Sequence, residues 1–255
     1  MAKKITLIGL ETIPIIKPGD DLAKVIFEAL KREKVDLDDG DILVIAQKIV
    51  SKAENRILDL RDLKPSKKAV KLASLTGKDP RFIEAVLTES DKVVKALKDH
   101  IIVKTRLGLV CSNAGVDISN VSGNDNIVCL LPVDPDKSAE EIRKKIEKLT
   151  GKKVGVLITD TFGRPLRDGQ VDVTIGLSNV KPFRDYRGSK DMKGYTLQVK
   201  NIAVADELAS AAELLIGQGK EKIPVVVVKG LNELVDEGKF TARVLNMPEE
   251  RWLFK

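Results

Sequence analysis

The sequence has few of the residues on which several common kinds of site depend. In 255 residues it holds one histidine, His100, and two cysteines, Cys111 and Cys129. A single histidine excludes a zinc site built on several histidines and a relay between two imidazoles, so we expect a structural role for His100. Both cysteines lie in β-branched, apolar stretches, which predicts buried free thiols.

Aromatic residues are also scarce. They make up 4% of the chain, too few for a platform on which nucleic-acid bases stack. The net charge is +6, but acids interrupt the lysines, as in residues 140–148, and this pattern is typical of a solvated helix face. We therefore expect no nucleic-acid partner, and a positive charge balance fits small anionic substrates equally well.

No apolar run approaches the roughly 20 residues that a membrane helix needs. The N-terminus passes directly into a strand-like segment without the apolar core of a signal peptide. We expect a cytoplasmic protein with no membrane partner.

Several familiar catalytic and nucleotide-binding motifs are missing. The sequence contains no G-x-x-x-x-G-K-[ST], G-x-G-x-x-G, H-E-x-x-H or G-x-S-x-G. Residues 217–220, Gly-Gln-Gly-Lys, resemble part of a phosphate-binding loop, but they follow a predicted helix and precede a predicted strand. That order is the reverse of a P-loop, and the spacing alone predicts a helix C-cap with a left-handed glycine.

Helix and strand signals alternate without one regular period. Buried strands are expected at 41–45, 154–159 and 224–228, and β-branched runs between 100 and 131 predict antiparallel strands. Helix starts are expected at Asp20 or Asp21, at Ser66, at Asp79 with Pro80, and at a capping box of Ser138 and Glu141, and residues 203–216 form an apolar helix. The patterns predict a mixed α/β or α+β class with a central sheet and no linker.

Two polar loops follow hydrophobic strands, at residues 111–120 and 159–170. Asp117 and Asp160 at strand ends are candidate oxygen ligands for Mg²⁺ or Mn²⁺, with the Thr161 hydroxyl assisting. The alternative is that both loops are tight turns in which aspartates cap backbone amides. Two such loops in one chain favour a metal–phosphate site, although the turn alternative stays open.

Basic side chains near these loops fit the same chemistry. Arg164 and Arg167 are candidate bidentate donors to phosphate or carboxylate oxygens. Lys48 and Lys52, four residues apart beyond a strand, can present two ammonium groups to a polyphosphate, or can be an ordinary solvated pair. The residues alone therefore indicate a metal-dependent enzyme acting on phosphates and do not identify the acceptor.

Read together and in order, these loops resemble the coenzyme F420-0:γ-glutamyl ligase family. Most specific are Asn-Ala-Gly-Val-Asp at 113–117 and Asp-Thr-Phe-Gly-Arg-Pro at 160–165. The matching stretches are 13–21, 40–54, 105–120, 160–176, 184–188 and 206–213, nearly the full chain.

The resemblance implies a GTP-dependent ligase that adds L-glutamate to coenzyme F420-0 through a γ-linkage. It also implies a homodimer and a family-specific α+β fold of mixed, largely antiparallel sheets with flanking helices, not a Rossmann or ATP-grasp fold. Residues 1–255 would form one ligase module of two intertwined subdomains, without the C-terminal flavin domain of some relatives.

The resemblance also assigns site residues. Asp117 and Asp160 are similar to the ligands of one divalent metal, and Thr161 and Gln218 to those of a second, so that Mg²⁺ or Mn²⁺ would be bound in pairs, with K⁺ a further candidate. For Gln218 this replaces the helix-cap interpretation. Guanine-nucleotide contacts are implied for a larger set: Ile13, Pro14, Ile15, Ile16, Gln47, Lys48, Lys52 and Asn120.

Two rival functions remain from the sequence. A γ-glutamyl ligase of the same mechanism acting on another acceptor, such as a folate, would have the same nucleotide and metal loops. A non-catalytic nucleotide- or nucleic-acid-binding protein would use the +6 charge and bind polyanions with a steep salt dependence.

Overall fold

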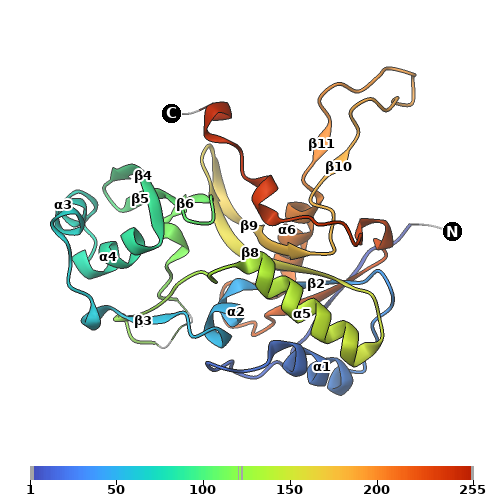
Figure 1. Ribbon diagram of the computed structural model, residues 1–255, viewed down its shortest axis with the longest axis horizontal. Coiled ribbons are helices and arrows are strands. Elements are labelled where there is room, and N and C mark those ends of the chain that lie inside the picture. Colours follow the sequence, from blue (N-terminus) through green and yellow to red (C-terminus); the bar gives the residue numbers. More distant parts are fainter. Residues whose placement is uncertain (1–2, 120, 122, 254–255) are drawn as a thin grey trace.

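A five-stranded sheet forms the centre of the computed structural model, which describes residues 3–119, 121 and 123–253 (Figure 1). The strand order is β1-β12-β2-β8-β9. Their bounds are Thr6–Gly9 for β1, Val225–Lys229 for β12, Ile42–Ala46 for β2, Gly155–Arg164 for β8 and Arg167–Ser178 for β9. Only β2 and β8 are parallel, and the other neighbours pair antiparallel. The predicted α+β class is confirmed, and this strand order is not that of a Rossmann sheet.

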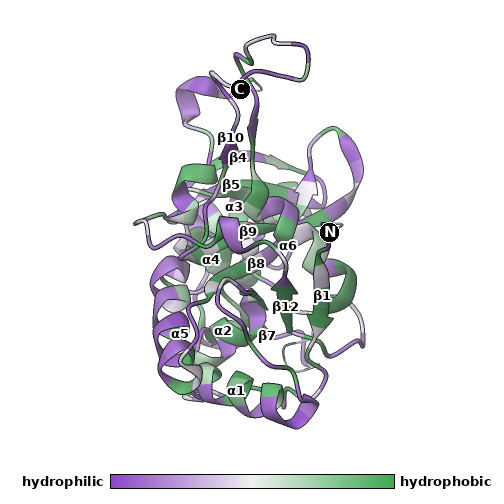
Figure 2. Cartoon of the chain, turned by 90° about the vertical axis from the view of Figure 1, so that its right-hand side faces the viewer, coloured by the Kyte–Doolittle hydropathy of each residue, from purple (hydrophilic) through white to green (hydrophobic). Residues whose placement is uncertain are grey.

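Helices cover both faces of the central sheet. Alternate residues of β2 point to opposite sides: Leu43 and Ile45 pack with α1 (Leu22–Glu33) and α5 (Pro135–Thr150), while Ile42 and Val44 pack with α6 (Val204–Ile216). Figure 2 shows hydrophobic colour on β1 and β12 and hydrophilic colour along the outer side of α5. The sheet is buried on both faces, which is why its strands are continuous apolar runs in the sequence.

A second group of elements packs around its own apolar core at the other end of the molecule (Figure 1). Its helices are α3 (Lys67–Thr76) and α4 (Pro80–Thr88). Its sheet has the order β4-β5-β6, with bounds Ser90–Leu97, His100–Thr105 and Val110–Ser112. The pair β3 (Ile57–Asp59) and β7 (Ile127–Cys129) leads to it from the central sheet.

The remaining elements are short. Helix α2 (Gln47–Ala53) follows β2 without a loop, and β10 (Arg184–Asp185) pairs with β11 (Asn201–Ile202) at the base of an arm that projects from the body (Figure 1). Turns of 3₁₀ helix lie at Leu60–Asp62, Asn113–Gly115, Asn232–Leu234, Ala242–Leu245 and Glu249–Arg251. No helix in the described part of the chain is long and apolar enough to cross a membrane. Both cysteines are buried free thiols, as predicted.

Most predicted helix starts are confirmed. Asp21, Ser66 and Asp79 each accept a backbone N–H in the first turn of α1, α3 and α4. The capping box at Ser138 is wrong: α5 begins at Pro135, and Asp134 caps it by accepting the Lys137 N–H at 3.0 Å. An aspartate before a proline is itself a strong helix start, because proline lacks the N–H that would be unsatisfied there.

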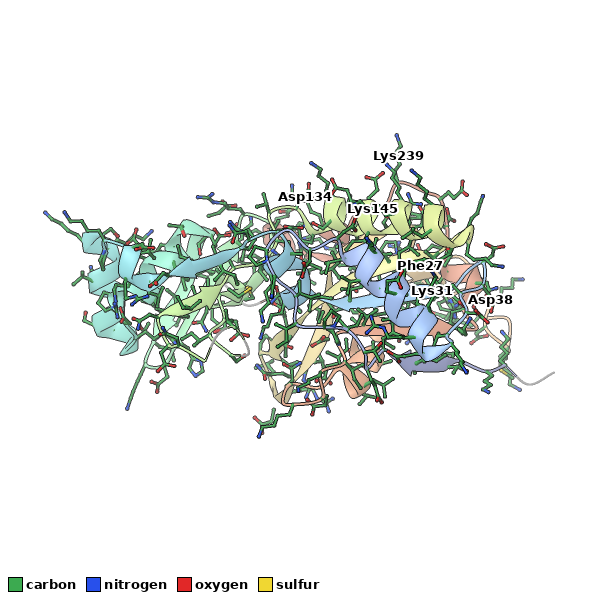
Figure 3. The ribbon with its side chains drawn as sticks, turned by 90° about the horizontal axis from the view of Figure 1, so that it is seen from below. Phe27, Lys31, Asp38, Asp134, Lys145 and Lys239 are labelled. Carbon is green, nitrogen blue, oxygen red and sulfur yellow. The ribbon has the colours of Figure 1, made fainter. Side chains whose placement is uncertain are left out.

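Charged side chains pin α1 against α5 on the outer surface. Lys145 of α5 donates to the α1 cap Asp21 at 3.0 Å; within α1 itself, Lys31 lies 4.1 Å from the centre of the Phe27 ring (Figure 3). The Lys145 ammonium is the largest cause of the lowered pKa of Asp21. These contacts are exposed and are worth little individually, so the apolar face beneath them decides the packing of the two helices.

Asp136 joins three elements. Its Oδ1 accepts the N–H of Leu177 in β9 at 2.9 Å and of Ala242 at 2.8 Å. Close approach is possible because β9 has Gly176 here, where a Cβ would lie 2.5 Å from the Pro135 carbonyl. Burial is the largest cause of the raised pKa of Asp136, so its ionised form is held in a partly desolvated position by backbone donors.

Replacing Asp136 by alanine should lower the free energy of unfolding by about 2 to 4 kcal/mol, because two backbone N–H groups lose their acceptor. Asp136→Asn keeps an acceptor oxygen and should cost much less. Since the folded pKa is raised, the folded state binds a proton first as the pH falls from neutral toward 3.8. Wild-type stability should therefore rise relative to Asp136→Asn over that window. Urea unfolding at several pH values measures both effects, and equal losses in the two variants would contradict the assigned contacts.

Candidate active site

A cleft of about 960 Å³ lies where the parallel pairing of β2 and β8 ends, at Ala46 and Thr159. The ends of parallel strands meet at one edge of a sheet, and ligands commonly bind there. Four segments surround these ends: residues 13–16, helix α2, the loop after β6, and the loop 216–224 between α6 and β12. The cleft thus brings together segments that are far apart in the sequence.

Nearly all of the predicted ligand residues line this cleft. They are Ile13, Pro14, Ile15, Ile16, Gln47, Lys48, Lys52, Asp117, Asp160, Thr161 and Gln218. Asn120 lies outside the described residues. Arg164 and Arg167 are not among the lining residues. They are paired strand residues on either side of the β8–β9 turn, where Arg164 donates from Nε to the Gly169 carbonyl at 3.3 Å and from Nη2 to that of Asp168.

Lys48 and Asp117 form an ion pair on one side of the cleft. Lys48 Nζ lies 2.6 Å from Asp117 Oδ2 and also donates to the Ser119 carbonyl at 2.8 Å. Ser119 fixes the carboxylate further, because its N–H and its hydroxyl both donate to Asp117 at 2.8 Å. Although burial opposes it, this set of donors lowers the pKa of Asp117. Asp117 is therefore an oriented, ionised carboxylate at neutral pH.

Asp160 is in the opposite electrostatic state. Burial, followed by the negative charges of Asp172 and Asp117, raises the pKa of Asp160 to about 7. The two carboxyl groups of the cleft thus differ in pKa: that of Asp117 is lowered and that of Asp160 is raised. Asp160, the more buried of the two, has too little positive charge around it to stabilise its ionised form. Such perturbed groups in a cleft are typical of functional sites.

Lys52 lies one helical turn beyond Lys48 on α2, so both ammonium groups face the same side. Desolvation and the neighbouring charge of Lys48 lower the pKa of Lys52. A polyanion placed between the two lysines would offset the cost of both effects, since its negative charge stabilises the two ammonium groups.

Asp172 is a cleft residue that the sequence did not reveal. It is 3% exposed and accepts hydrogen bonds from the hydroxyls of Thr159 and Thr161 at 3.0 and 2.8 Å. Residues 171–177 read as an ordinary apolar strand with alternating Asp172 and Thr174. The only sequence signal for Asp172 as a site residue was this alternation of polar and apolar residues. It can be interpreted only once β9 is known to pair with β8.

The cleft loop at 113–115 has an unusual backbone. Asn113, Ala114 and Gly115 have φ values of 54°, 55° and 70°, and a Cβ on Gly115 would lie 2.7 Å from the Leu131 side chain. Consecutive left-handed residues cost free energy and persist where packing dictates them. The loop places Asp117 at the cleft by means of the bridge between Asp117 and Cys129.

The donor set fits a divalent cation that shares its coordination with phosphates. Asp117, Asp160, Thr161 and Gln218 offer oxygen ligands from one cleft. Within the described ranges no three His, Cys, Asp or Glu side chains converge on a common point, as a closed protein cage would need. Mg²⁺ bound with a nucleotide commonly takes one or two carboxylates and completes its shell with phosphate oxygens and waters.

Fold and cleft together define a mixed α+β enzyme whose active site combines carboxylates with ammonium groups. Comparison with known families is specific. Residues 11–230 match the family described as F420-0:Gamma-glutamyl ligase, and the chain belongs to this family. The resemblance predicted from the loop motifs is thereby confirmed.

Curated relatives match over most of their length. Coenzyme F420:L-glutamate ligase of Methanothermobacter thermautotrophicus is 46% identical over 226 residues, 89% of this chain and 89% of the relative. The protein of the same name from Methanocaldococcus jannaschii is 43% identical over 255 residues, 99% and 98% of the two chains. That from Archaeoglobus fulgidus is 45% identical over 229 residues, 90% and 89%.

Proposed function

We propose that this protein is a GTP-dependent ligase that joins L-glutamate to coenzyme F420-0 through a γ-linkage, as a step in F420 biosynthesis. The observation that carries the proposal is the convergence in one cleft of Asp117, Asp160 and the two α2 lysines. Relatives named coenzyme F420:L-glutamate ligase, which align along nearly the whole chain, support the amino acid and the acceptor.

The proposed reaction has two steps. The terminal carboxylate of the acceptor attacks the γ-phosphorus of GTP; a carboxyl O–P bond forms, the β–γ bridge breaks, and GDP leaves. The amine of glutamate, after losing a proton, then attacks the acyl phosphate carbon. An amide bond forms, the C–O bond to phosphate breaks, and inorganic phosphate leaves.

In this proposal each part of the cleft has a task. Lys48 and Lys52 hold the phosphate chain, and residues 13–16 with Gln47 and Asn120 contact the guanosine. Asp117 and Asp160 would hold one divalent cation, Mg²⁺ or Mn²⁺, and Thr161 with Gln218 a second. Bound there, the cations would neutralise charge that develops on the transferred phosphoryl group. Arg164 and Arg167 are proposed to approach the acceptor or the phosphate from the hairpin.

The test is an assay of the purified protein with Mn²⁺ or Mg²⁺, GTP, L-glutamate and F420-0, with products read by mass spectrometry. GDP together with an acceptor heavier by one glutamyl unit supports the proposal. GDP formation only with a folate or another carboxylate would transfer the function to that acceptor. Glutamate-independent binding of nucleotides without turnover would overturn the ligase assignment.

Two further parts of the proposal have separate measurements. A homodimer is expected, and light scattering on the eluted protein determines the mass. Stimulation by K⁺ is expected as well, and replacing K⁺ by Na⁺ at constant ionic strength tests it. A monomeric mass or identical rates in both salts would remove the corresponding part and leave the ligase chemistry in place.

A further inference from the structure

Asp172 is held in place from both sides of its carboxylate. Thr159 Oγ1 donates to Oδ2 at 3.0 Å and Thr161 Oγ1 to Oδ1 at 2.8 Å. Thr161 and Asp172 are directly paired in the β8–β9 register, and Ser210 of α6 donates to the Asp172 carbonyl at 2.8 Å. The carboxylate is therefore fixed by the sheet and by the helix behind it.

The charge of Asp172 is not balanced within the described protein. Among the residues that the structure places, no lysine or arginine forms an ion pair with it, although its side chain lines the cleft at 3% exposure. A buried carboxylate without a cation is costly, so its retention in a cleft points to positive charge delivered by a ligand.

Thr161 connects this carboxylate to the open side of the cleft. Its hydroxyl has one proton, which it gives to Asp172, and it accepts the Gln218 Nε2 donor at 2.8 Å. Gln218 also lies 3.4 Å from Glu213 Oε1. The lone pairs of Thr161 Oγ1 are thus directed away from Asp172 and toward the side from which Gln218 approaches.

The proposed second cation would have a weak set of protein ligands without Asp172. Thr161 and Gln218 are both neutral, whereas hard divalent cations are usually held by carboxylates. Groups that orient a ligand and make it more basic commonly change metal affinity by tenfold to a hundredfold. The hydrogen bond from Thr161 to Asp172 has this arrangement.

We propose that Asp172 is the positioning residue of the second cation site: it holds the Thr161 hydroxyl with its oxygen toward the cation and supplies the negative charge that Thr161 and Gln218 lack. This inference rests on the proposed function. The alternative of a general base is less compatible with the geometry, because both carboxylate oxygens already accept hydroxyl protons.

The experiment measures Mn²⁺ binding to the full chain, with and without a non-hydrolysable GTP analogue, by the electron paramagnetic resonance signal of free Mn²⁺. Asp172→Asn and Thr161→Val are each expected to weaken one Mn²⁺ by about tenfold to a hundredfold in the presence of the analogue. The double variant should lose less than the sum of the two single losses, since Asp172 acts in part through Thr161. Thr161→Ser keeps the hydroxyl and should weaken binding much less than Thr161→Val.

Asp206→Asn is the matched control. Asp206 is also a partly buried aspartate that contacts β9: its carboxylate accepts the Thr174 N–H at 2.9 Å. It does not line the cleft. Its substitution should leave Mn²⁺ binding unchanged. Asp172→Glu provides a second test if the asparagine variant does not fold: it keeps the charge, moves it by one methylene, and should also weaken the site.

The outcomes separate the two levels of the proposal. Two Mn²⁺ in the wild type with unchanged binding in a folded Asp172 variant, or additive losses in the double variant, would overturn the role of Asp172 and leave the ligase function standing. A wild-type protein that binds no second Mn²⁺ with the nucleotide analogue would overturn the proposed two-cation site itself.

Discussion

Replacing Asp160 by alanine is expected to abolish ligase turnover, with a loss of about a thousandfold or more, while the fold remains. The estimate follows from several kcal/mol of charge stabilisation that a metal-bound phosphoryl transfer would lose with a ligand. Asp160 lines the cleft from within β8, just beyond the part of the strand that pairs with β2, and desolvation and two neighbouring carboxylates raise its pKa to about 7. Turnover is measured as GDP release and as glutamyl adduct.

Asp168→Asn is the control for this variant. Asp168 lies near the start of β9 in the same hairpin, is exposed, and does not line the cleft, so its loss of charge should leave the rate near that of the wild type. Circular dichroism and thermal unfolding establish that each variant folds. A folded Asp160→Ala protein with full activity would refute the assignment of Asp160 to the metal.

The stability of the cation-free protein gives an independent check at this position. Because the folded pKa of Asp160 is raised to about 7 from 3.8, its ionised form opposes folding above pH 7, and this cost declines progressively as the pH falls from about 7 toward 3.8. Asp160→Asn should therefore be at least as stable as the wild type at pH 8. A residue that is retained although it weakens the fold is expected at a functional site.

The sequence predicted the central strands other than β9, and most helices, because each of these signals was local. Buried runs such as 224–228 and caps such as Asp21, Ser66 and Asp79 carry their own evidence within a few residues. The order of the strands was not predictable in this way. The placement of β12, near the end of the described chain, between β1 and β2 depends on contacts that no local pattern records.

The candidate site was predictable to the extent that its residues follow buried apolar runs, but the predicted loop at 159–170 is wrong, because these residues are the paired ends of β8 and β9 around a short turn. Asp117 and Asp160 were singled out from two loops, and the structure brings both into one cleft with Lys48. Asp172 was missed because it lies inside a strand, where a polar residue has no special meaning until the paired strand is known. For Gln218 the local spacing indicated only a helix end; the family resemblance assigned it to the site, and in the structure it lies beside Thr161.

Replacing Lys48 by methionine is expected to have two effects of opposite sign. In the structure the Lys48 ammonium lies 2.6 Å from Asp117, so a divalent cation that binds Asp117 without nucleotide must displace it. Removing this charge should strengthen Mn²⁺ binding in the absence of nucleotide by about tenfold or more. The reason is that the Lys48 ammonium and a Mn²⁺ bound to Asp117 would repel each other by several kcal/mol at close range, even at an intermediate dielectric constant. The same change should weaken GTP binding and lower turnover by about a hundredfold, because a phosphate loses its charged donor.

Measuring both quantities on one protein distinguishes this exchange of partners from simple damage to the cleft. Titration of Mn²⁺ alone and of GTP with excess Mg²⁺ should move in opposite directions for Lys48→Met, whereas Lys71→Met, at an exposed lysine of α3, should move neither. If both affinities fell together, Lys48 would be a structural partner of Asp117. If the two affinities move in opposite directions as expected, the Lys48–Asp117 ion pair is the resting state of the site. Lys48 then stays paired with Asp117 until nucleotide and cation bind together. At that point the phosphates pair with Lys48 and the cation binds Asp117.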